Sequence, residues 1–485
     1  MSMLTPLDSP IVCPITVGRE PHIAAADRLL DQLVSGQGQT LLITGEAGIG
    51  KSRLVSEIKT RAIERRCRVI QSECFETDRA LPYAPFLELL RELLPEFVET
   101  PTGLDPEQHK RRLFQAVTDS LAGAARERPL LMVIEDVHWA DETSLELMRA
   151  LARTSAQQRL LLVLTFRSDE IDDGLRGLLT ALDRQRLSVE LRLQRLSRSN
   201  LDAMLRAIFH RTRPSRGEFL DLLYGLTEGN PFFIEEVLRA LVGAGDIFVQ
   251  DGTWERKPIA DLRVPRSVED AVQRRTAQLT PGAREVVQLA AVAGRRFDFE
   301  LLGALSGLDE STLLSLVKEL IAAGLMVEES ADQLAFRHAL TRQAIYASLL
   351  GRERRALHRK VAQALEQIGS PDAVEASADL AYHHAEAAQW QPALVYARKA
   401  GELALRMYAP RAAVEQFTRA LDASDALRQP GDPELFRLRG QANDLLGEFD
   451  AAQADLEASV GAARGRGPHG GMACSSRPQP VVGTP

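Results

Sequence analysis

The stretch LLITGEAGIGKSRL, residues 41–54, constrains the fold more than any other part of the chain. An apolar run of strand type ends in a glycine-rich turn, and a segment of helical type follows it. Gly45, four intervening residues, and then Gly50, Lys51 and Ser52 form the Walker A pattern, which is meaningful in this strand-to-helix context. The sequence therefore predicts a parallel α/β sheet, because crossover helices connect the strands of such sheets.

The chemistry of this loop indicates a bound phosphate group. Its glycines allow backbone N–H groups to turn inward, Lys51 adds a positive charge, and the Ser52 hydroxyl is a ligand for Mg²⁺. We therefore expect ATP or ADP, with Mg²⁺, to bind here. The candidate loop residues are Gly45, Glu46, Ala47, Gly48, Ile49, Gly50, Lys51, Ser52 and Arg53.

A second apolar run, LLMVIEDVHWAD at residues 130–141, ends in carboxylates. Glu135 and Asp136 are predicted to lie where Mg²⁺ and an attacking water sit beside the phosphates, as in a Walker B segment. The alternative role for such acids is to cap the next helix, and Asp141 suits that role. The candidate metal ligands are thus Ser52, Glu135 and Asp136, and the sequence leaves open which of the two acids binds the metal.

Short β-rich runs alternate with helical patterns from about residue 16 to 195. The predicted strands are residues 40–44, 68–72, 130–134, 160–165 and 189–193. Three are nearly continuously apolar, as strands covered on both faces are, whereas the last alternates and suits a sheet edge. Arg167 follows the fourth strand and completes the catalytic candidates with Glu135 and Asp136, because it can reach a γ-phosphate. The alternative is a solvated arginine paired with Asp169 or Glu170.

Helical periodicity replaces the β signal after residue 196. A hairpin is predicted over 246–257, around the Asp251-Gly252 turn. Short helices and then two β-like runs, at 325–338, are typical of a winged helix. From about 356 the chain is Ala-rich, with the aromatic-then-small spacing of tetratricopeptide-type (TPR) helix pairs. The last segment, 465–485, holds nine Gly or Pro and no acidic residue, which indicates disorder.

Composition and charge argue against several classes of protein. The net charge is −8, from 59 basic and 67 acidic residues, which does not favour binding to nucleic acid or an anionic membrane. The basic run at 352–360 is interpreted as a solvated helix face. The four cysteines and nine histidines lack metal-ligand spacing. With no signal peptide pattern and no run of 18 apolar residues, we expect a cytoplasmic protein that does not enter the membrane.

Five motifs, taken in order, resemble one family. They are VGRE (17–20), GEAGIGKS (45–52), EDVHWAD (135–141), LTFR (164–167) and TEGNPFFIEEVL (227–238). Together they resemble the signal-transduction ATPases with numerous domains (STAND), a class of P-loop ATPases with an AAA or Orc1-like module. The likeness is strongest to large bacterial transcriptional regulators of the MalT and LuxR type and to ATPase modules linked to adenylate cyclases. It extends from about residue 15 to 460.

The resemblance implies further nucleotide-binding residues. Val17 and Arg19 are similar to a segment that packs beside the adenine and ribose. Pro231 resembles the proline that lies against the base from a helical lid, and His338 resembles the winged-helix histidine that touches the β-phosphate of ADP. Taken without the family, Pro231 is a helix-initiating proline after Asn230, and His338 is a core histidine.

The resemblance also implies a division of the chain. We expect a flexible N-terminus (1–14), a P-loop ATPase domain (15–195), a helical lid (196–262), a winged helix (263–355), TPR-like helical repeats (356–464) and a disordered tail (465–485). The fold class is thus an α/β domain followed by all-α parts.

The implied function is an ATP-binding and slowly hydrolysing switch. It would be the sensor and ATPase part of a LuxR/MalT-type regulator whose C-terminal DNA-binding domain is missing from this chain. ADP would hold three domains closed, and ATP would open them for self-association. The helical repeats would bind an unidentified protein or small-molecule inducer. The alternatives are a stand-alone ATP-dependent scaffold and an Orc1-like ATPase that contacts DNA through its winged helix.

Overall fold

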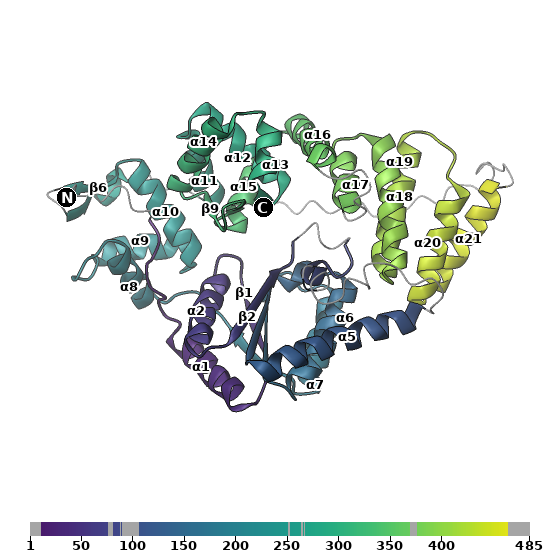
Figure 1. The fold of residues 1–485 in the computed structure, drawn as a ribbon. Coiled ribbons are helices and arrows are strands. Elements are labelled where there is room, and N and C mark those ends of the chain that lie inside the picture. Colours follow the sequence, from purple (N-terminus) through teal and green to yellow (C-terminus); the bar gives the residue numbers. More distant parts are fainter. Residues whose placement is uncertain are drawn as a thin grey trace.

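The computed structural model describes residues 11–75, 81–87, 89, 106–250, 253–262, 265, 267–368 and 376–463. The predicted tail (465–485), most of the predicted flexible N-terminus and the Asp251-Gly252 turn lie outside these residues. Figure 1 shows an α/β domain below, two smaller domains above and to the left of it, and a row of helices on the right.

A five-stranded parallel sheet forms the centre of the first domain, in the order β2-β3-β4-β1-β5. Its strands are β1 (Gln39–Gly45), β2 (Arg68–Glu73), β3 (Leu130–Glu135), β4 (Leu160–Arg167) and β5 (Ser188–Arg192). The predicted parallel sheet is confirmed, with each strand end within two residues of its expected position. The alternating strand, β5, lies at an edge, and the apolar strands β3 and β4 are buried along their whole length.

Helices cover both faces of this sheet because its strands place apolar side chains on both sides. On one face, α1 (Glu20–Ser35) and α2 (Lys51–Glu64) share a core with Leu131 and Val133 of β3. On the other face, α5 (Pro106–Glu127), α6 (Glu142–Ser155) and α7 (Asp173–Arg184) pack on Met132 and Ile134. The 3-10 turns η3 (Ala84–Phe86) and η4 (Val137–Trp139) complete this domain, and Asp141 caps α6 as expected.

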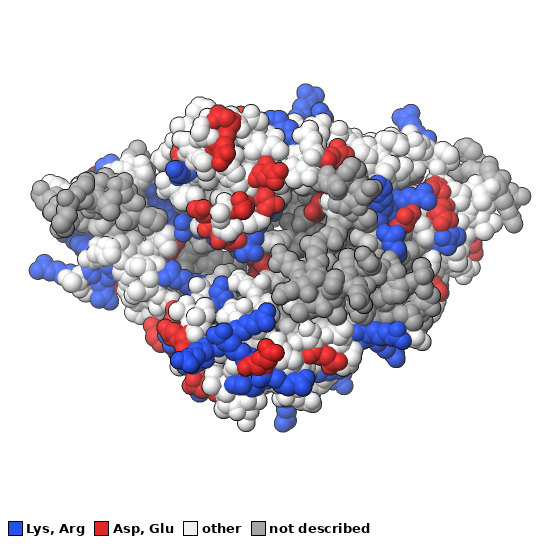
Figure 2. All heavy atoms as spheres, viewed as in Figure 1, with Lys and Arg blue, Asp and Glu red and all other residues white. Residues whose placement is uncertain are grey.

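Oppositely charged side chains alternate on the outer surface of α1 and α2. Arg61 and Arg65 of α2 form ion pairs with Asp27 of α1, and Arg65 also pairs with Asp31. Figure 2 shows blue and red side chains mixed over this lower part of the molecule. On the face shown, basic and acidic side chains of the first domain therefore lie close to one another.

Three helices and a hairpin form the second domain. They are α8 (Arg198–Ile208), α9 (Gly217–Thr227), α10 (Pro231–Gly243), β6 (Ile247–Gln250) and β7 (Thr253–Arg256), followed by the 3-10 turn η5 (Ile259–Asp261). Ser197 caps α8 by accepting a hydrogen bond from the backbone N–H of Asn200. The hairpin predicted over 246–257 is present, with Gln250 paired to Thr253.

The third domain combines five helices with a small antiparallel sheet. Its elements are α11 (Val268–Ala277), α12 (Pro281–Ala293), β8 (Arg296–Asp298), α13 (Phe299–Ser306), α14 (Glu310–Ala322), β9 (Met326–Glu328), β10 (Gln333–Phe336) and α15 (Ala339–Ser348). The two β-like runs expected at 325–338 are β9 and β10. The sheet has the order β8-β10-β9, and β8 was not anticipated from the sequence.

Antiparallel helices make up the rest of the described chain. They are α16 (Gly351–Ile368), α17 (Ser377–Glu386), α18 (Trp390–Arg406), α19 (Pro410–Ala426), α20 (Pro433–Leu446) and α21 (Phe449–Ala463). The row runs back toward the first domain, where Arg411 of α19 pairs with Glu142 of α6 at 2.6 Å (Figure 1). Among the described residues, no helix has the length and apolar character needed to cross a membrane.

A buried cluster of histidines joins α15, α16 and α17. His358 is the one buried position of the basic run at 352–360, whose other residues are exposed or half-buried. Its Nε2 lies 3.0 Å from the Tyr346 hydroxyl, and its Nδ1 lies 2.9 Å from Nδ1 of His383. Burial lowers the pKa of His358 to about 4 and that of His383 to about 3. Both imidazoles are therefore neutral near pH 7.

These pKa values predict a specific loss of stability in acid. Because folding lowers both pKa values below the usual 6.5, protonation favours the unfolded chain. This contribution to stability is complete above about pH 6.5 and is lost progressively as the pH falls toward 4. We expect the melting temperature of His383→Phe to depend less steeply on pH than that of the wild type between pH 6.5 and 4. The exposed His210→Asn serves as control; identical pH profiles for all three proteins would contradict this assignment.

Candidate functional site

The loop between β1 and α2 has a backbone that only glycine adopts easily. Gly45, Gly48 and Gly50 have φ values of +154°, +75° and +102°, in the region that L side chains rarely enter. Gly48 is also restricted in space, because a Cβ there would lie 2.8 Å from the Cβ of Phe232. The glycines of the motif thus allow the backbone to form this turn, and Gly48 also allows the second domain to pack closely against it.

Lys51 begins α2 and lies under the loop. Its Nζ donates hydrogen bonds to the carbonyl oxygens of Gly45, at 2.8 Å, and Glu46, at 3.0 Å. Burial lowers the pKa of Lys51 to about 8, an effect that the negative charge of Asp136 partly offsets. The ammonium group is thus charged near pH 7 and held close to the loop.

The second domain docks directly on this loop through the segment that starts α10. Asn230 donates from Nδ2 to the carbonyl of Ala47 at 3.0 Å, and its Oδ1 accepts from the N–H of Phe232 at 3.1 Å. That N–H also lies 3.3 Å from the carbonyl oxygen of Gly48. Pro231 is the first residue of α10 and lines the cavity described below, whereas its contact with a base stays a prediction.

Glu135 ends β3 and Asp136 follows it, and the two acids take different positions. Glu135 is buried, accepts a hydrogen bond from Gln71 Nε2 at 2.9 Å, and is hydrogen-bonded by the Ser52 hydroxyl. Asp136 has a φ of +54° and lines the cavity. Burial raises the pKa of both carboxyl groups. The structure thus brings the three predicted metal ligands to one edge of the sheet.

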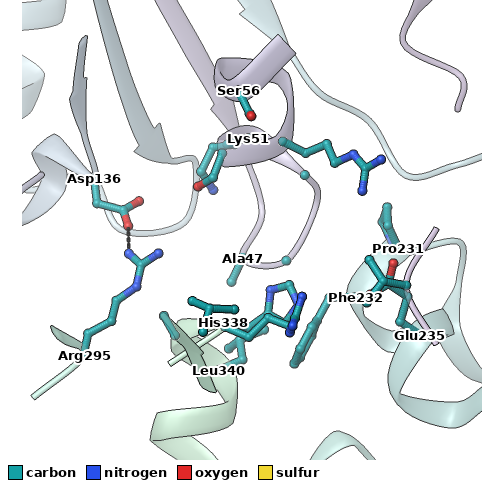
Figure 3. A pocket seen from close by; sticks show the side chains of 18 of the residues that line it. Ala47, Lys51, Ser56, Asp136, Pro231, Phe232, Glu235, Arg295, His338 and Leu340 are labelled. Atoms are coloured by element: carbon teal, nitrogen blue, oxygen red, sulfur yellow. Dashed lines mark hydrogen bonds and ion pairs between the residues drawn. The ribbon is translucent and has the colours of Figure 1, made fainter. Parts of the chain in front are cut away.

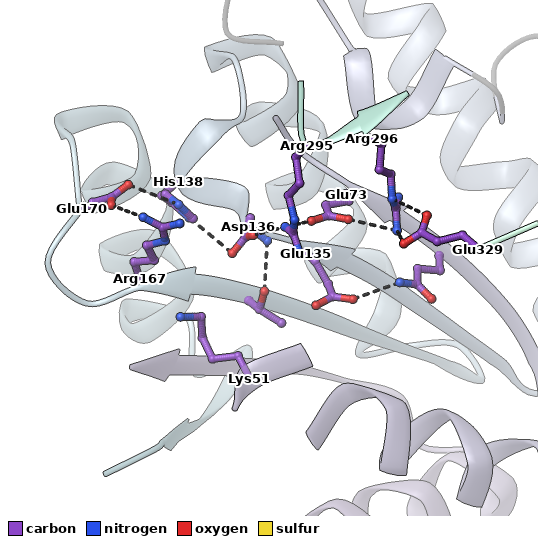
Figure 4. Close-up of polar contacts among 12 residues, drawn as sticks. Lys51, Glu73, Glu135, Asp136, His138, Arg167, Glu170, Arg295, Arg296 and Glu329 are labelled. Atoms are coloured by element: carbon purple, nitrogen blue, oxygen red, sulfur yellow. Dashed lines mark hydrogen bonds and ion pairs between the residues drawn. The ribbon is translucent and has the colours of Figure 1, made fainter. Parts of the chain in front are cut away.

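Arg167 ends β4 beside this edge and is buried rather than solvated. It pairs with Glu170, the partner considered as an alternative from the sequence, and it also lines the cavity. Glu170 in turn has its Oε2 3.3 Å from Nε2 of His138 (Figure 4). The guanidinium group therefore lies at the predicted place but is held by an acid of its own domain.

The third domain reaches the site through the start of α15. His338 is half-buried, and its ring centroid lies 4.5 Å from that of Phe232 in α10. Its Nε2 has no hydrogen-bond partner among the described residues. Burial, reinforced by nearby arginines, lowers the pKa of His338 well below the usual 6.5. A neutral imidazole with a free nitrogen is thus placed at the junction of two domains.

Side chains from all three domains enclose one cavity of about 510 Å³ (Figure 3). The first domain lines it with the loop and the start of α2, Asp136 and Arg167. The second domain adds Pro231, Phe232 and Glu235. The third domain adds Arg295, Val327 and residues 337–340. Of the predicted residues, Ala47, Gly48, Gly50, Lys51, Ser52, Arg53, Asp136, Arg167, Pro231 and His338 line this cavity.

Other predicted residues support the loop without lining the cavity. Ile49 is buried in the first-domain core, and its carbonyl accepts a hydrogen bond from Arg19 Nη2 at 2.9 Å. Val17 packs against the second-domain core, and Glu46 pairs with Arg195 at 2.9 Å. For Val17 and Arg19, contact with a base and ribose stays a prediction.

Nine lining residues were not predicted as site residues, and four of them carry a charge or an aromatic ring. Phe232 and Glu235 lie within the motif TEGNPFFIEEVL, and Arg337 is next to His338, so each has a signal in a neighbouring residue. Arg295 has none, because it stands in an ordinary segment between α12 and β8. Its guanidinium group pairs with Asp136 at 2.9 Å across domains (Figure 4).

Comparison with known proteins agrees with this geometry for the first domain. Residues 16–164 match the model of the AAA ATPase domain. This part of the chain is a P-loop AAA ATPase module. An uncharacterized protein of Rhizobium meliloti (strain 1021) is 28% identical over 396 residues, which are 72% of this chain and 37% of that protein. The peroxide stress-activated histidine kinase mak3 of Schizosaccharomyces pombe is 24% identical over 201 residues, or 40% of this chain and 8% of the kinase.

The chain thus spans little more than a third of the length of the first relative. Two solved structures share low identity with it. A STAND protein with a tetratricopeptide repeat sensor from Pyrococcus horikoshii has a TM-score of 0.47 and 12% identity, over 96% of this chain and 67% of that one. The Aeropyrum pernix Orc1 protein in complex with DNA has a TM-score of 0.37 and 16% identity, over 69% and 93%.

The docking of Asn230 yields a prediction for the coupling between loop and second domain. Asn230→Ala removes a helix cap and the bond to Ala47, which together cost about 1–2 kcal/mol. We expect faster amide hydrogen exchange in the loop, residues 45–50, as well as a lower melting temperature. Asp309→Ala removes a similar cap at the exposed N-terminus of α14 and should leave exchange in the loop unchanged. Equal loop exchange in the two variants would show that Asn230 acts as a cap alone.

Proposed function

We propose that this chain is a nucleotide-operated switch, in which ADP or ATP joins the AAA ATPase module to the second and third domains. The observation that carries the proposal is the single cavity lined by all three. Its charged lining consists of Lys51 and four arginines against the two acids Asp136 and Glu235. An excess of cations around a glycine-rich loop suits the phosphates of a nucleotide.

The lining side chains suggest a role for each domain. The loop N–H groups and Lys51 would hold the phosphates, and Pro231 with Phe232 would pack on the base. His338 would donate a hydrogen bond to the β-phosphate from its free nitrogen, since a neutral imidazole has one N–H to offer. The second and third domains would therefore both be fixed by the same ligand.

The residues at the sheet edge fit a divalent cation. Ser52, Glu135 and Asp136 offer the oxygen ligands that Mg²⁺ prefers, and the metal would neutralise phosphate charge. Arg167 would have to leave Glu170 in order to reach a γ-phosphate. ATP would thus change contacts that ADP leaves intact, as a ligand must if it is to shift a conformational equilibrium. Hydrolysis would be slow and would return the switch to the ADP state.

Within this proposal the chain is the sensor and ATPase part of a signalling protein, and more specifically of a LuxR/MalT-type transcriptional regulator. The third domain would be a winged helix that binds the nucleotide, and residues 356–464 would be TPR-like repeats that receive a protein or small-molecule inducer. Opening would permit self-association. Because the chain spans 37% of its Rhizobium relative, the role of the whole protein is part of the proposal.

A second candidate function is a scaffold that binds a partner through the helical repeats. Exposed apolar side chains gather on α20 and α21, where Leu445, Phe449, Leu456 and Val460 are between 47% and 68% exposed. Exposed apolar patches of this kind are typical of protein contacts. The nucleotide cavity would then control access to the repeats.

Lys51→Ala tests nucleotide binding itself. Loss of the ammonium group beside the loop should reduce ADP affinity by about 100-fold or more, because a charge-assisted contact to phosphate is lost. Isothermal titration with ADP measures this effect. Lys318→Ala, an exposed position on α14 that does not line the cavity, should bind ADP as the wild type does. Wild-type affinity in Lys51→Ala would exclude the proposed function.

His338→Ala tests the contribution of the third domain. We expect ADP to dissociate about 10-fold or more faster, because a buried hydrogen bond to phosphate is lost, and the balance of monomer and oligomer to change. Stopped-flow displacement of a fluorescent ADP and sedimentation velocity measure the two effects. The exposed His210→Asn provides the control. If neither quantity differs between the two variants, the three-domain clamp is wrong.

A further inference from the structure

Arg295 brings a positive charge from the third domain to the sheet edge of the first. Its Nη1 lies 2.9 Å from Oδ2 of Asp136 and also contacts the Glu73 carboxylate (Figure 4). The neighbouring Arg296 pairs with Glu73 at 3.1 Å and with Glu329 at 2.6 Å. Two consecutive arginines of one domain thus bind acids of another.

Glu73 explains why this place attracts a cation. It ends β2 and is in register with Glu135 at the end of β3, so three acids stand at the same edge of the sheet. The side chain of Glu73 is only 3% exposed. Buried carboxylates without a counter-charge cost several kcal/mol. The Arg295 guanidinium group, in contact with both Glu73 and Asp136, supplies that counter-charge.

We propose that Arg295 and a divalent cation compete for Asp136, so that metal binding releases the third domain from the sheet edge. This inference rests on the proposed function and adds its regulation. Oδ2 of Asp136 already accepts the Arg295 guanidinium group, and Oδ1 faces the His138 ring at 3.9 Å. A metal ion bound to Asp136 would lie at contact distance from the positively charged guanidinium group of Arg295. The two cations repel each other, so the metal would displace Arg295 from Asp136.

The consequence is a switch that distinguishes nucleotides by their metal. ADP alone leaves Arg295 on Asp136 and the domains closed, whereas a nucleotide that carries Mg²⁺ weakens the same contact. The two effects are linked thermodynamically. If the metal weakens the contact between Arg295 and Asp136 by some factor, this contact lowers the metal affinity by the same factor. Arg296 provides a matched comparison, because its ion pairs go to Glu73 and Glu329.

The test measures metal binding to the full chain rather than turnover. Metal-free protein is saturated with ADP, Mn²⁺ is titrated, and free Mn²⁺ is read by electron paramagnetic resonance. We expect Arg295→Gln to bind Mn²⁺ about 10-fold tighter than the wild type, and Arg296→Gln to stay within about 2-fold of it. Equal Mn²⁺ affinity in Arg295→Gln and the wild type would overturn the proposal.

A second measurement uses the wild type alone and does not depend on a variant that folds. With ADP bound, adding Mg²⁺ should increase amide hydrogen exchange at residues 294–298, and unchanged exchange there would overturn the proposal. ADP binding in the presence of EDTA is measured first. If ADP does not bind in the presence of EDTA, the proposed function is refuted. If ADP binds but the metal has no effect on amide exchange, only the competition between Arg295 and the metal is refuted.

Discussion

The common direction of the five parallel strands is the constraint on which the site depends. Strands that run the same way end at the same edge of their sheet, so the residues that follow them meet there. The loop after β1, the acids at the ends of β2 and β3, and Arg167 at the end of β4 are far apart in sequence and adjacent in space. The sheet thus gathers phosphate-binding and acidic groups, and it also creates a concentration of negative charge that needs cations.

Polar contacts supply much of what joins the domains. Apolar cores lie within the first, second and third domains. Between the second and third domains, Glu236 of α10 pairs with Arg275 of α11 at 2.9 Å, and between the first and third, Arg295 pairs with Asp136. When another charge takes the place of one partner in such an ion pair, the net change in free energy is small, because the remaining charge is still paired. Such interfaces open and close more readily than apolar ones, which suits a switch.

Sequence reasoning succeeded where the signal was local. Continuous apolar runs such as 130–134 and 160–165 predicted buried strands because a parallel sheet is covered on both faces, and Asp141 was recognised as a cap by its position. It failed where function depends on contacts between distant residues. Arg295 meets Asp136 across 159 positions, and Glu73 resembles any strand-end acid until its register with β3 is known. His338 was found through its likeness to a family, since an isolated histidine carries no signal of its neighbours.

The backbone at Asp136 bears on the choice between the two acids of β3. Asp136 takes a left-handed conformation, which costs most residues about 1 kcal/mol or more but is tolerated by Asp and Asn. At this turn the chain leaves the direction of β3, and the Asp136 carboxylate lines the cavity. Glu135 is still part of the strand, and its side chain contacts Gln71 and the Ser52 hydroxyl. Of the two acids, Asp136 is therefore the one that lines the cavity, whereas Glu135 contacts Gln71 behind it. One requirement then explains both the left-handed backbone and the residue type at position 136. The chain must turn out of the sheet there while it carries a carboxylate, and aspartate is the charged residue that best tolerates this backbone conformation.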